Sequence, residues 1–225
     1  MLGYINALGE SDCEEITSEA LAQPVNSISS FAFSIVGLVV IYWARSVAGI
    51  ERELRLAFGA ILVLTGFGSY LFHGPQPPVS QFAHDITFLA AIALIVIANL
   101  AAGLSWSRQR LWVLFSIVLL VESGVLILAP GATNTLMVMG VVLWVASHFV
   151  LARLGGISVK LLASSLLAMA LAVAFFALGR EGGPICDPDS LFQGHAVWHV
   201  LSAVGIGTYF AATSPPRIAS LGTAL

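Results

Sequence analysis

The sequence predicts an all-α, polytopic membrane protein: one seven-transmembrane helix bundle that takes up residues 1–225 as a single domain. Of the 225 residues, 58% are hydrophobic and only 9% are charged, whereas about a quarter of a typical soluble domain is charged. The mean hydropathy is +0.95. Apolar stretches long enough to cross a bilayer recur along the chain. This composition excludes a soluble enzyme, and with so few charges it also excludes a nucleic-acid-binding protein, which needs a basic surface.

The elements follow in order along the chain. Residues 1–24 form a short acidic segment outside the membrane, and turn signals at 74–78, 130–131 and 182–184 separate the apolar stretches that follow. None of these stretches alternates like a barrel strand, and each is about twice as long as such a strand, so we expect helices. The predicted spans are 25–46, 54–73, 80–103, 110–129, 132–153, 158–179 and 190–213.

The basic residues predict the orientation of this bundle. With seven spans, one side of the membrane holds only Arg180. The other side holds Arg45, Arg52, Arg55, Arg108, Arg110, Arg153, Lys160 and Arg217. Because basic loops stay in the cytoplasm, we expect the N-terminus outside and the C-terminus in the cytoplasm. Cys13 and Cys186 then share the oxidising side, where a disulfide between them is chemically allowed.

Ionisable side chains inside the predicted spans mark a candidate site, because such groups are costly in a membrane and are usually functional. They are His73, His84, Asp85, Glu122, His148, His195 and His199. The topology places all of them except Glu122 and His148 near the non-cytoplasmic ends of three helices. The polar layer is therefore predicted to lie near the non-cytoplasmic side.

The spacing within this layer favours a metal site. His195 and His199 are four residues apart, so their imidazoles project from one helical face and can share an ion. Ser69 and His73 have the same spacing. Three imidazoles with one open position form a catalytic zinc site, in which Asp85 would orient or deprotonate the attacking water. The alternative is that these histidines only form hydrogen bonds between helices, and His84 is expected at a helix interface.

Four segments resemble a known family. They are CEE at 13–15 with NSIS at 26–29, GSYLFH at 68–73, Asp85, and Cys186 with HAVWH at 195–199. In these segments the sequence resembles the alkaline ceramidase family, within the superfamily of seven-helix membrane hydrolases that includes the adiponectin-receptor proteins. The resemblance spans both ends of the chain, and the middle matches only as apolar helices.

The resemblance implies roles for individual residues. His73, His195 and His199 would bind zinc. Asp85 would act as the general base on the zinc-bound water and then protonate the leaving amine, and Ser69 would hydrogen-bond this water or the developing oxyanion. The bridge of the family between the N-terminal segment and the last loop maps onto Cys13 and Cys186.

The resemblance also implies a calcium site in the N-terminal segment, for which Glu14 matches one ligand. Ser11, Ile16 and Gln23 stand where the family typically has Asp, Asn and Glu. Because calcium needs six to eight oxygen ligands, Asp12, Glu15 and Glu19 would have to replace the missing ones.

The expected function is therefore zinc-dependent hydrolysis of an amide bond within the membrane. The substrate would be a ceramide-like N-acyl lipid of the surrounding bilayer, cleaved to a fatty acid and a long-chain amine. Two alternatives stay open: a zinc hydrolase of lipid esters, as in a phospholipase, and a lipid-sensing receptor without catalytic activity. The sequence indicates no protein partner.

Overall fold

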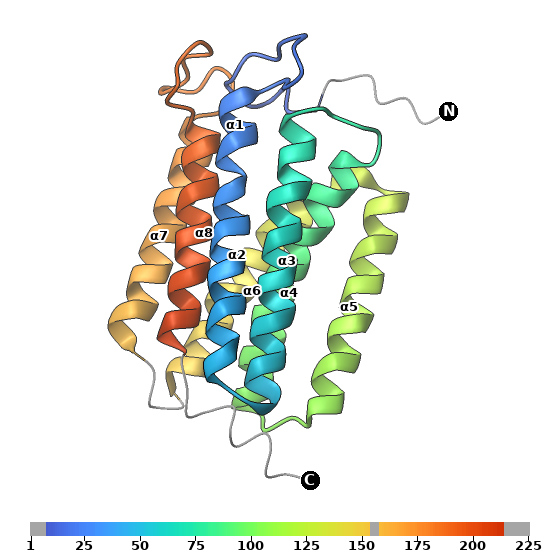
Figure 1. The fold of residues 1–225 in the computed structure, drawn as a ribbon, viewed down its shortest axis with the longest axis vertical. Coiled ribbons are helices and arrows are strands. Elements are labelled where there is room, and N and C mark those ends of the chain that lie inside the picture. Colours follow the sequence, from blue (N-terminus) through green and yellow to red (C-terminus); the bar gives the residue numbers. More distant parts are fainter. Residues whose placement is uncertain (1–7, 154–157, 214–225) are drawn as a thin grey trace.

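Long helices dominate the structure, a computed structural model that describes residues 8–153 and 158–213. Helices α1 and α2 follow each other with only Ser30 between them and form the first rod of the bundle (Figure 1). The helices are α1 (Pro24–Ser29), α2 (Phe31–Trp43), α3 (Gly49–His73), α4 (Ser80–Gly103), α5 (Arg108–Leu128), α6 (Thr133–Arg153), α7 (Val159–Leu178) and α8 (Gly194–Ala212). Short 3-10 helices cover Ala44–Ser46 and Pro130–Ala132. The described residues contain no β-strand, which confirms the all-α class.

Six rods are long and apolar enough to cross a membrane: Pro24–Ser46, Gly49–His73, Ser80–Gly103, Arg108–Leu128, Pro130–Leu151 and Val159–Leu178. Helix α8, which we predicted as the seventh span, is not among them, although it is of similar length. Its hydropathy is lowered by His195 and His199, the two residues that the sequence singled out on it. These six helices indicate a multi-pass membrane protein.

Many large apolar side chains lie on the perimeter of the bundle. Exposed apolar side chains include Ile35, Leu38, Leu64, Leu120, Val142 and Leu167. A soluble protein does not expose so many large apolar side chains, whereas a bundle surrounded by lipid does. The surface therefore supports the same conclusion as the helix lengths.

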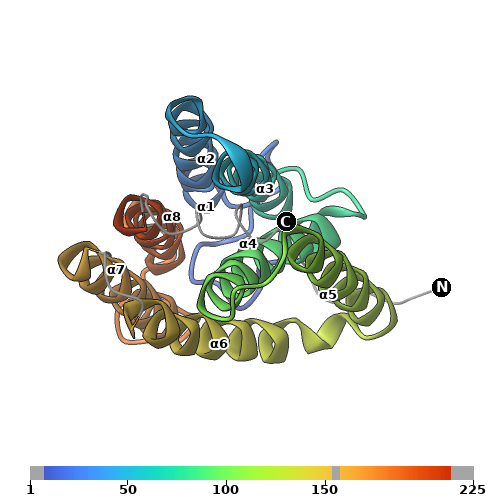
Figure 2. The ribbon, with the colours of Figure 1, turned by 90° about the horizontal axis from the view of Figure 1, so that it is seen from below.

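Helix α4 is the central element. It packs against α3, α5 and α6, while α2 packs against both α3 and α8, and α8 packs against α7 (Figure 2). The core between these helices contains Phe33, Phe58, Leu62, Leu89 and Leu94, all nearly inaccessible to solvent. Helix α5 lies at the edge, since only Leu111, Phe115 and Leu126 of this helix are buried.

Glycines bring the backbones close together near one end of the bundle. A side chain at Gly68 would approach the carbonyl oxygen of Ala83 within 2.6 Å, so α3 and α4 can meet here only without one. Gly179 and Gly194 face each other in the same way, at the end of α7 and the start of α8. These contacts fix the helix ends that carry the candidate site.

Two irregular segments cover this end: residues 8–23 before α1 and the connection between α7 and α8 (Figure 1). They meet where Asp12 and Arg180 form an isolated backbone bridge and where the Glu181 amide donates to the carbonyl of Ser11 at 3.1 Å. The chain thus closes one end of the bundle with its own N-terminal segment.

Candidate metal centre

Three histidines converge at the covered end of the bundle. His73 is the last residue of α3, and His195 and His199 lie on the first turns of α8. One nitrogen of each ring lies within 4.8 Å of the others, a spacing that would allow the three to hold a metal ion. The ring centroids are 4.6–5.2 Å apart, and all three residues are buried. The structure confirms that the three predicted histidines form a group that could hold a metal.

The Nδ1 atom of each ring faces an oxygen from the N-terminal part of the chain. His73 Nδ1 lies 2.7 Å from Oε1 of Gln23, and His199 Nδ1 lies 2.9 Å from the hydroxyl of Ser29. His195 Nδ1 lies 3.0 Å from a carboxylate oxygen of Asp12, as an ion-pair contact rather than a well-directed hydrogen bond. Such outer partners orient the imidazoles that bind metals and fix their tautomer.

The hydrogen bonds of these partners identify the proton on the ring. The amide nitrogen of Gln23 donates to the carbonyls of Gly9 and Glu14, so its oxygen must face His73. The Ser29 hydroxyl donates to the carbonyl of Asn26 and is therefore left to accept from His199. Both rings consequently carry their proton on Nδ1, which leaves Nε2 as a bare lone pair.

The Nε2 atoms of all three histidines belong to buried side chains, and two of these atoms lack a hydrogen-bond partner among the described residues. The Nε2 atoms of His73 and His195 have no hydrogen-bond partner in the described part of the chain, and His199 Nε2 lies 3.3 Å from the hydroxyl of Ser69. Ser69 is 2.8 Å from the Ser30 hydroxyl, which itself donates to Asn26. A buried acceptor without a donor is unfavourable, so a cluster of acceptor atoms fits a bound cation. The donor set, three imidazoles, is one that suits zinc.

Asp85, the predicted general base, lies on the first turns of α4 and is buried. One carboxylate oxygen lies 2.8 Å from Nδ1 of His84, and the other accepts a hydrogen bond from the Thr133 hydroxyl at 2.6 Å. Among the described residues, Asp85 does not belong to the metal-ligand group, which consists of the three histidines. His84, which we expected at a helix interface, stacks on Phe72, and its ring centroid lies 6.0 Å from that of His73.

The four acidic residues proposed for calcium do not converge. No three of them form a cluster that could hold a metal within the described ranges, where only the histidine group does. The Glu14 carboxylate accepts from the amides of Val25 and Asn26 at 2.6 and 2.8 Å and so caps the start of α1. Glu15 and Glu19 are exposed.

Asp12 lies between the histidines and the side chain of Arg180. Its carboxylate is 3.3 Å from the Arg180 guanidinium and 3.7 Å from His73 Nδ1, in addition to the contact with His195. Burial acts to raise the pKa of Asp12, but His195 and Arg180 outweigh this effect and hold the pKa below its ordinary value. Burial also raises the pKa of Glu14, and here the amides of α1 oppose the shift only in part.

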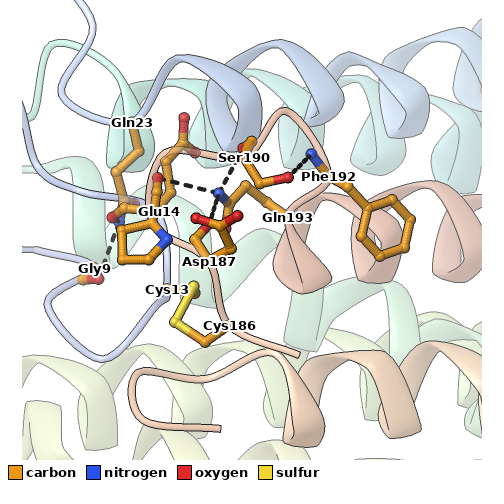
Figure 3. Close-up of a disulfide and its surroundings, with 10 residues drawn as sticks. Gly9, Cys13, Glu14, Gln23, Cys186, Asp187, Ser190, Phe192 and Gln193 are labelled. Atoms are coloured by element: carbon orange, nitrogen blue, oxygen red, sulfur yellow. Dashed lines mark hydrogen bonds between the residues drawn. A yellow bond between two sulfur atoms is a disulfide. The ribbon is translucent and has the colours of Figure 1, made fainter. Parts of the chain in front are cut away.

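A disulfide fastens this arrangement. Cys13 and Cys186 are bonded, which joins the N-terminal segment to the connection between α7 and α8 (Figure 3). Asp12 and Glu14 are the direct neighbours of Cys13, so the bond holds both carboxylates close to the histidine cluster. The structure confirms the pair that the sequence predicted.

Glu122 and His148 lie outside the cluster, as the sequence predicted. His148 belongs to a polar group of α4, α6 and α8, in which Asn99 donates to Ser147 at 2.8 Å and accepts from Tyr209. Glu122 is half-buried on α5. Neither residue contributes to the group of metal ligands.

The sequence did not reveal the residues that orient the histidines. Ser29 was noted only as part of the NSIS segment and Gln23 only as a departure from the resemblance, and Asp12 was predicted as a calcium ligand rather than a partner of His195. The only signal was their position in the same N-terminal region as Cys13. No protein-family model matches the chain, and no curated protein or solved structure matches it either. The geometry of the site and the resemblance in its motifs are therefore the grounds for a function of this chain.

Proposed function

We propose that this protein is a zinc-dependent hydrolase that cleaves the amide bond of a ceramide-like lipid within the membrane, releasing a fatty acid and a long-chain amine. The observation that carries the proposal is the group of three buried histidines, whose ring nitrogens lie within 4.8 Å of one another and of which His73 and His195 have no hydrogen-bond partner for Nε2 among the described residues. A zinc ion held by three imidazoles lowers the pKa of a coordinated water and polarises a carbonyl group. The resemblance to alkaline ceramidases supplies the substrate class.

The residues around the histidines suit the proton transfers of amide hydrolysis. Water adds across the carbon–nitrogen bond: the acyl carbon gains the hydroxyl group, and the amine nitrogen gains a proton. Asp85 takes up the proton that the attacking water loses and returns it to the leaving nitrogen. His84 lies beside both Asp85 and His73. The Ser69 hydroxyl, next to His199 Nε2, donates to the developing oxyanion.

We propose seven membrane crossings, with α8 as the seventh, the N-terminus outside and the C-terminus in the cytoplasm. The exposed basic residues support this orientation, since Arg45, Arg52, Arg108 and Lys160 lie at helix ends opposite the histidines. Arg217 lies outside the described residues. The disulfide lies at the histidine end, as expected for the oxidising side. The reaction would therefore occur near the non-cytoplasmic surface, where the amide of a ceramide lies.

The test is hydrolysis of a labelled ceramide by the purified protein in detergent, beside a phospholipid ester of the same chain length. We expect release of fatty acid from the amide, loss of this activity after treatment with a chelator, and its recovery with added zinc. His199→Ala should abolish hydrolysis, whereas His148→Ala, a change of the same kind far from the site, should retain it. Cleavage of the ester alone would identify a lipid esterase instead. Stoichiometric zinc without turnover of either lipid would favour a receptor.

A further inference from the structure

We propose that a shallow groove between α1 and the first turns of α8 holds one hydrocarbon chain of the lipid substrate, an inference that rests on the proposed function. Ser29 forms one wall, and the opposite wall consists of Leu191, Phe192, Val197, Val200 and Leu201. The groove opens on the outer surface of the bundle. It lies outside the core, against which its wall residue Leu201 packs, so a lipid can enter it directly from the bilayer.

The direction of the groove suits a lipid chain. Its residues on α8 lie on successive helical turns, Ala196 and Val197 and then Val200 and Leu201, and Phe192 precedes the helix. At 1.5 Å per residue, the four helical residues span roughly 7.5 Å along the helix. The groove therefore follows the bundle axis, which is the direction that the chains of bilayer lipids take.

The chemistry of the groove excludes a polar occupant. No charged residue lines it, and the amide nitrogen of Gln193 is already bonded to the carbonyls of Asp187, Pro188 and Ser190. Leu191 is 88% exposed, and the side chain of Phe192 points away from the disulfide and Gln193 (Figure 3). Apolar residues exposed at this level on a membrane protein are expected to contact lipid. A hydrocarbon chain is the occupant that these walls fit.

One residue connects the groove with the histidine cluster. Ser29 lines the groove, and its hydroxyl holds Nδ1 of His199 at 2.9 Å. A chain in the groove is therefore separated from the ring of His199 by the side chain of Ser29. The groove would thus determine how deeply the lipid lies in the membrane and present its amide at the height of the cluster.

The first test fills the groove. Val200→Trp should raise KM for a long-chain ceramide about tenfold, because displacing two methylene groups from an apolar surface changes affinity by about that factor. The acyl chain and the base chain of the ceramide are then shortened in turn. The substrate whose shortened chain no longer fills the groove should show the same KM with and without the substitution. Val204→Trp is the matched control, since Val204 lies one turn further along α8, outside the groove, and is 48% exposed against 44% for Val200.

Equal effects of the two tryptophans, or an unchanged KM with Val200→Trp, would overturn the proposal. The zinc content of each variant shows whether the neighbouring His199 is undisturbed. A variant that loses zinc is replaced by Leu201→Trp on the same wall, to which the same two outcomes apply.

The second test detects the chain without turnover. The chain has two cysteines, both in the disulfide, so Val200→Cys introduces a single thiol. Ceramide should slow its reaction with a maleimide and leave Val204→Cys unaffected. Protection without any hydrolysis by the wild type would support the groove and contradict the hydrolase. Hydrolysis without protection would support the hydrolase and contradict the groove.

Discussion

The proton positions on the histidines are the most informative detail at the scale of single residues. The amide nitrogen of Gln23 and the hydroxyl of Ser29 donate to backbone carbonyls, so their oxygen atoms accept from His73 and His199. Their oxygen atoms thus force the protons to Nδ1 and turn the lone pairs of Nε2 inward. The outer partners of His73 and His199 therefore leave Nε2 of each ring as an acceptor, which is what a bound cation requires.

Ser29→Ala tests this dependence. Removing the hydroxyl releases Nδ1 of His199, and we expect the affinity for zinc to fall about 10- to 100-fold, as is typical for loss of an outer partner of a metal ligand. The measurement is competition with a chromophoric chelator. Ser27→Ala is the control, since Ser27 lies in the same short helix and its hydroxyl likewise donates to a backbone carbonyl, that of Gln23. Equal losses of affinity in the two variants would contradict the role of Ser29.

The residues of the cluster could be predicted from the sequence, but their partners could not. An ionisable residue stands out in an apolar span, and this made His73, His195 and His199 visible. Asp12, Gln23 and Ser29 lie in or beside an irregular polar segment, where such side chains are common. Their positions depend on the packing of this segment against the bundle, which no local pattern encodes.

At the scale of elements, the N-terminal segment acts as a part of the site rather than as a cover. Glu14 caps α1, Asp12 faces His195 and Arg180, and Cys13 between them is tied to Cys186. Three interactions of different kinds thus hold a segment without regular structure. The segment positions Asp12, and through the start of α1 also Gln23 and Ser29.

The Cys13→Ser, Cys186→Ser double variant tests this connection. Loss of a native disulfide typically costs about 2–5 kcal/mol of stability, so we expect a lower temperature of thermal unfolding. We also expect faster loss of zinc to a chelator, because Asp12 is no longer held against His195. A reductant should have the same two effects on the wild type and none on the double variant. Unchanged zinc release in the double variant would show that the segment does not support the site.

Helix boundaries show what hydropathy can and cannot predict. Helix α3 begins at Gly49, five residues before the predicted span, because Glu51 and Arg55 form an ion pair one turn apart, at 2.6 Å. Such a pair stabilises a helix but lowers its hydropathy. Polar side chains also lower the hydropathy of α8, because this helix carries two of the three clustered histidines.

At the scale of the whole molecule, the candidate site and the exposed basic residues lie at opposite ends of the bundle. The histidine cluster, the disulfide and Arg180 lie at one end, whereas the exposed arginines of α3 and α5 lie at the other. The all-helical architecture and the apolar perimeter followed from the composition and from the length and pattern of the apolar stretches. Which helices contact one another did not, because a similar apolar pattern on every span leaves their order around α4 unspecified.

Accessibility of single thiols tests the proposed orientation. Glu181→Cys lies between α7 and α8, and Gln109→Cys lies at the start of α5; both positions are exposed. In intact cells, a membrane-impermeant maleimide should label Glu181→Cys, whereas Gln109→Cys should react only after permeabilisation. Labelling of both residues from the same side would contradict the proposed topology, and the reverse pattern would invert it.

The central claim is that the three buried histidines hold zinc, and the metal content of the purified protein tests it most directly. We predict stoichiometric zinc in the wild type, with an X-ray absorption spectrum that indicates imidazole nitrogen ligands, and loss of this zinc in His199→Ala but not in His148→Ala. Wild-type protein that keeps its fold and its disulfide yet binds no zinc, or His199→Ala protein that retains full zinc, would contradict the account.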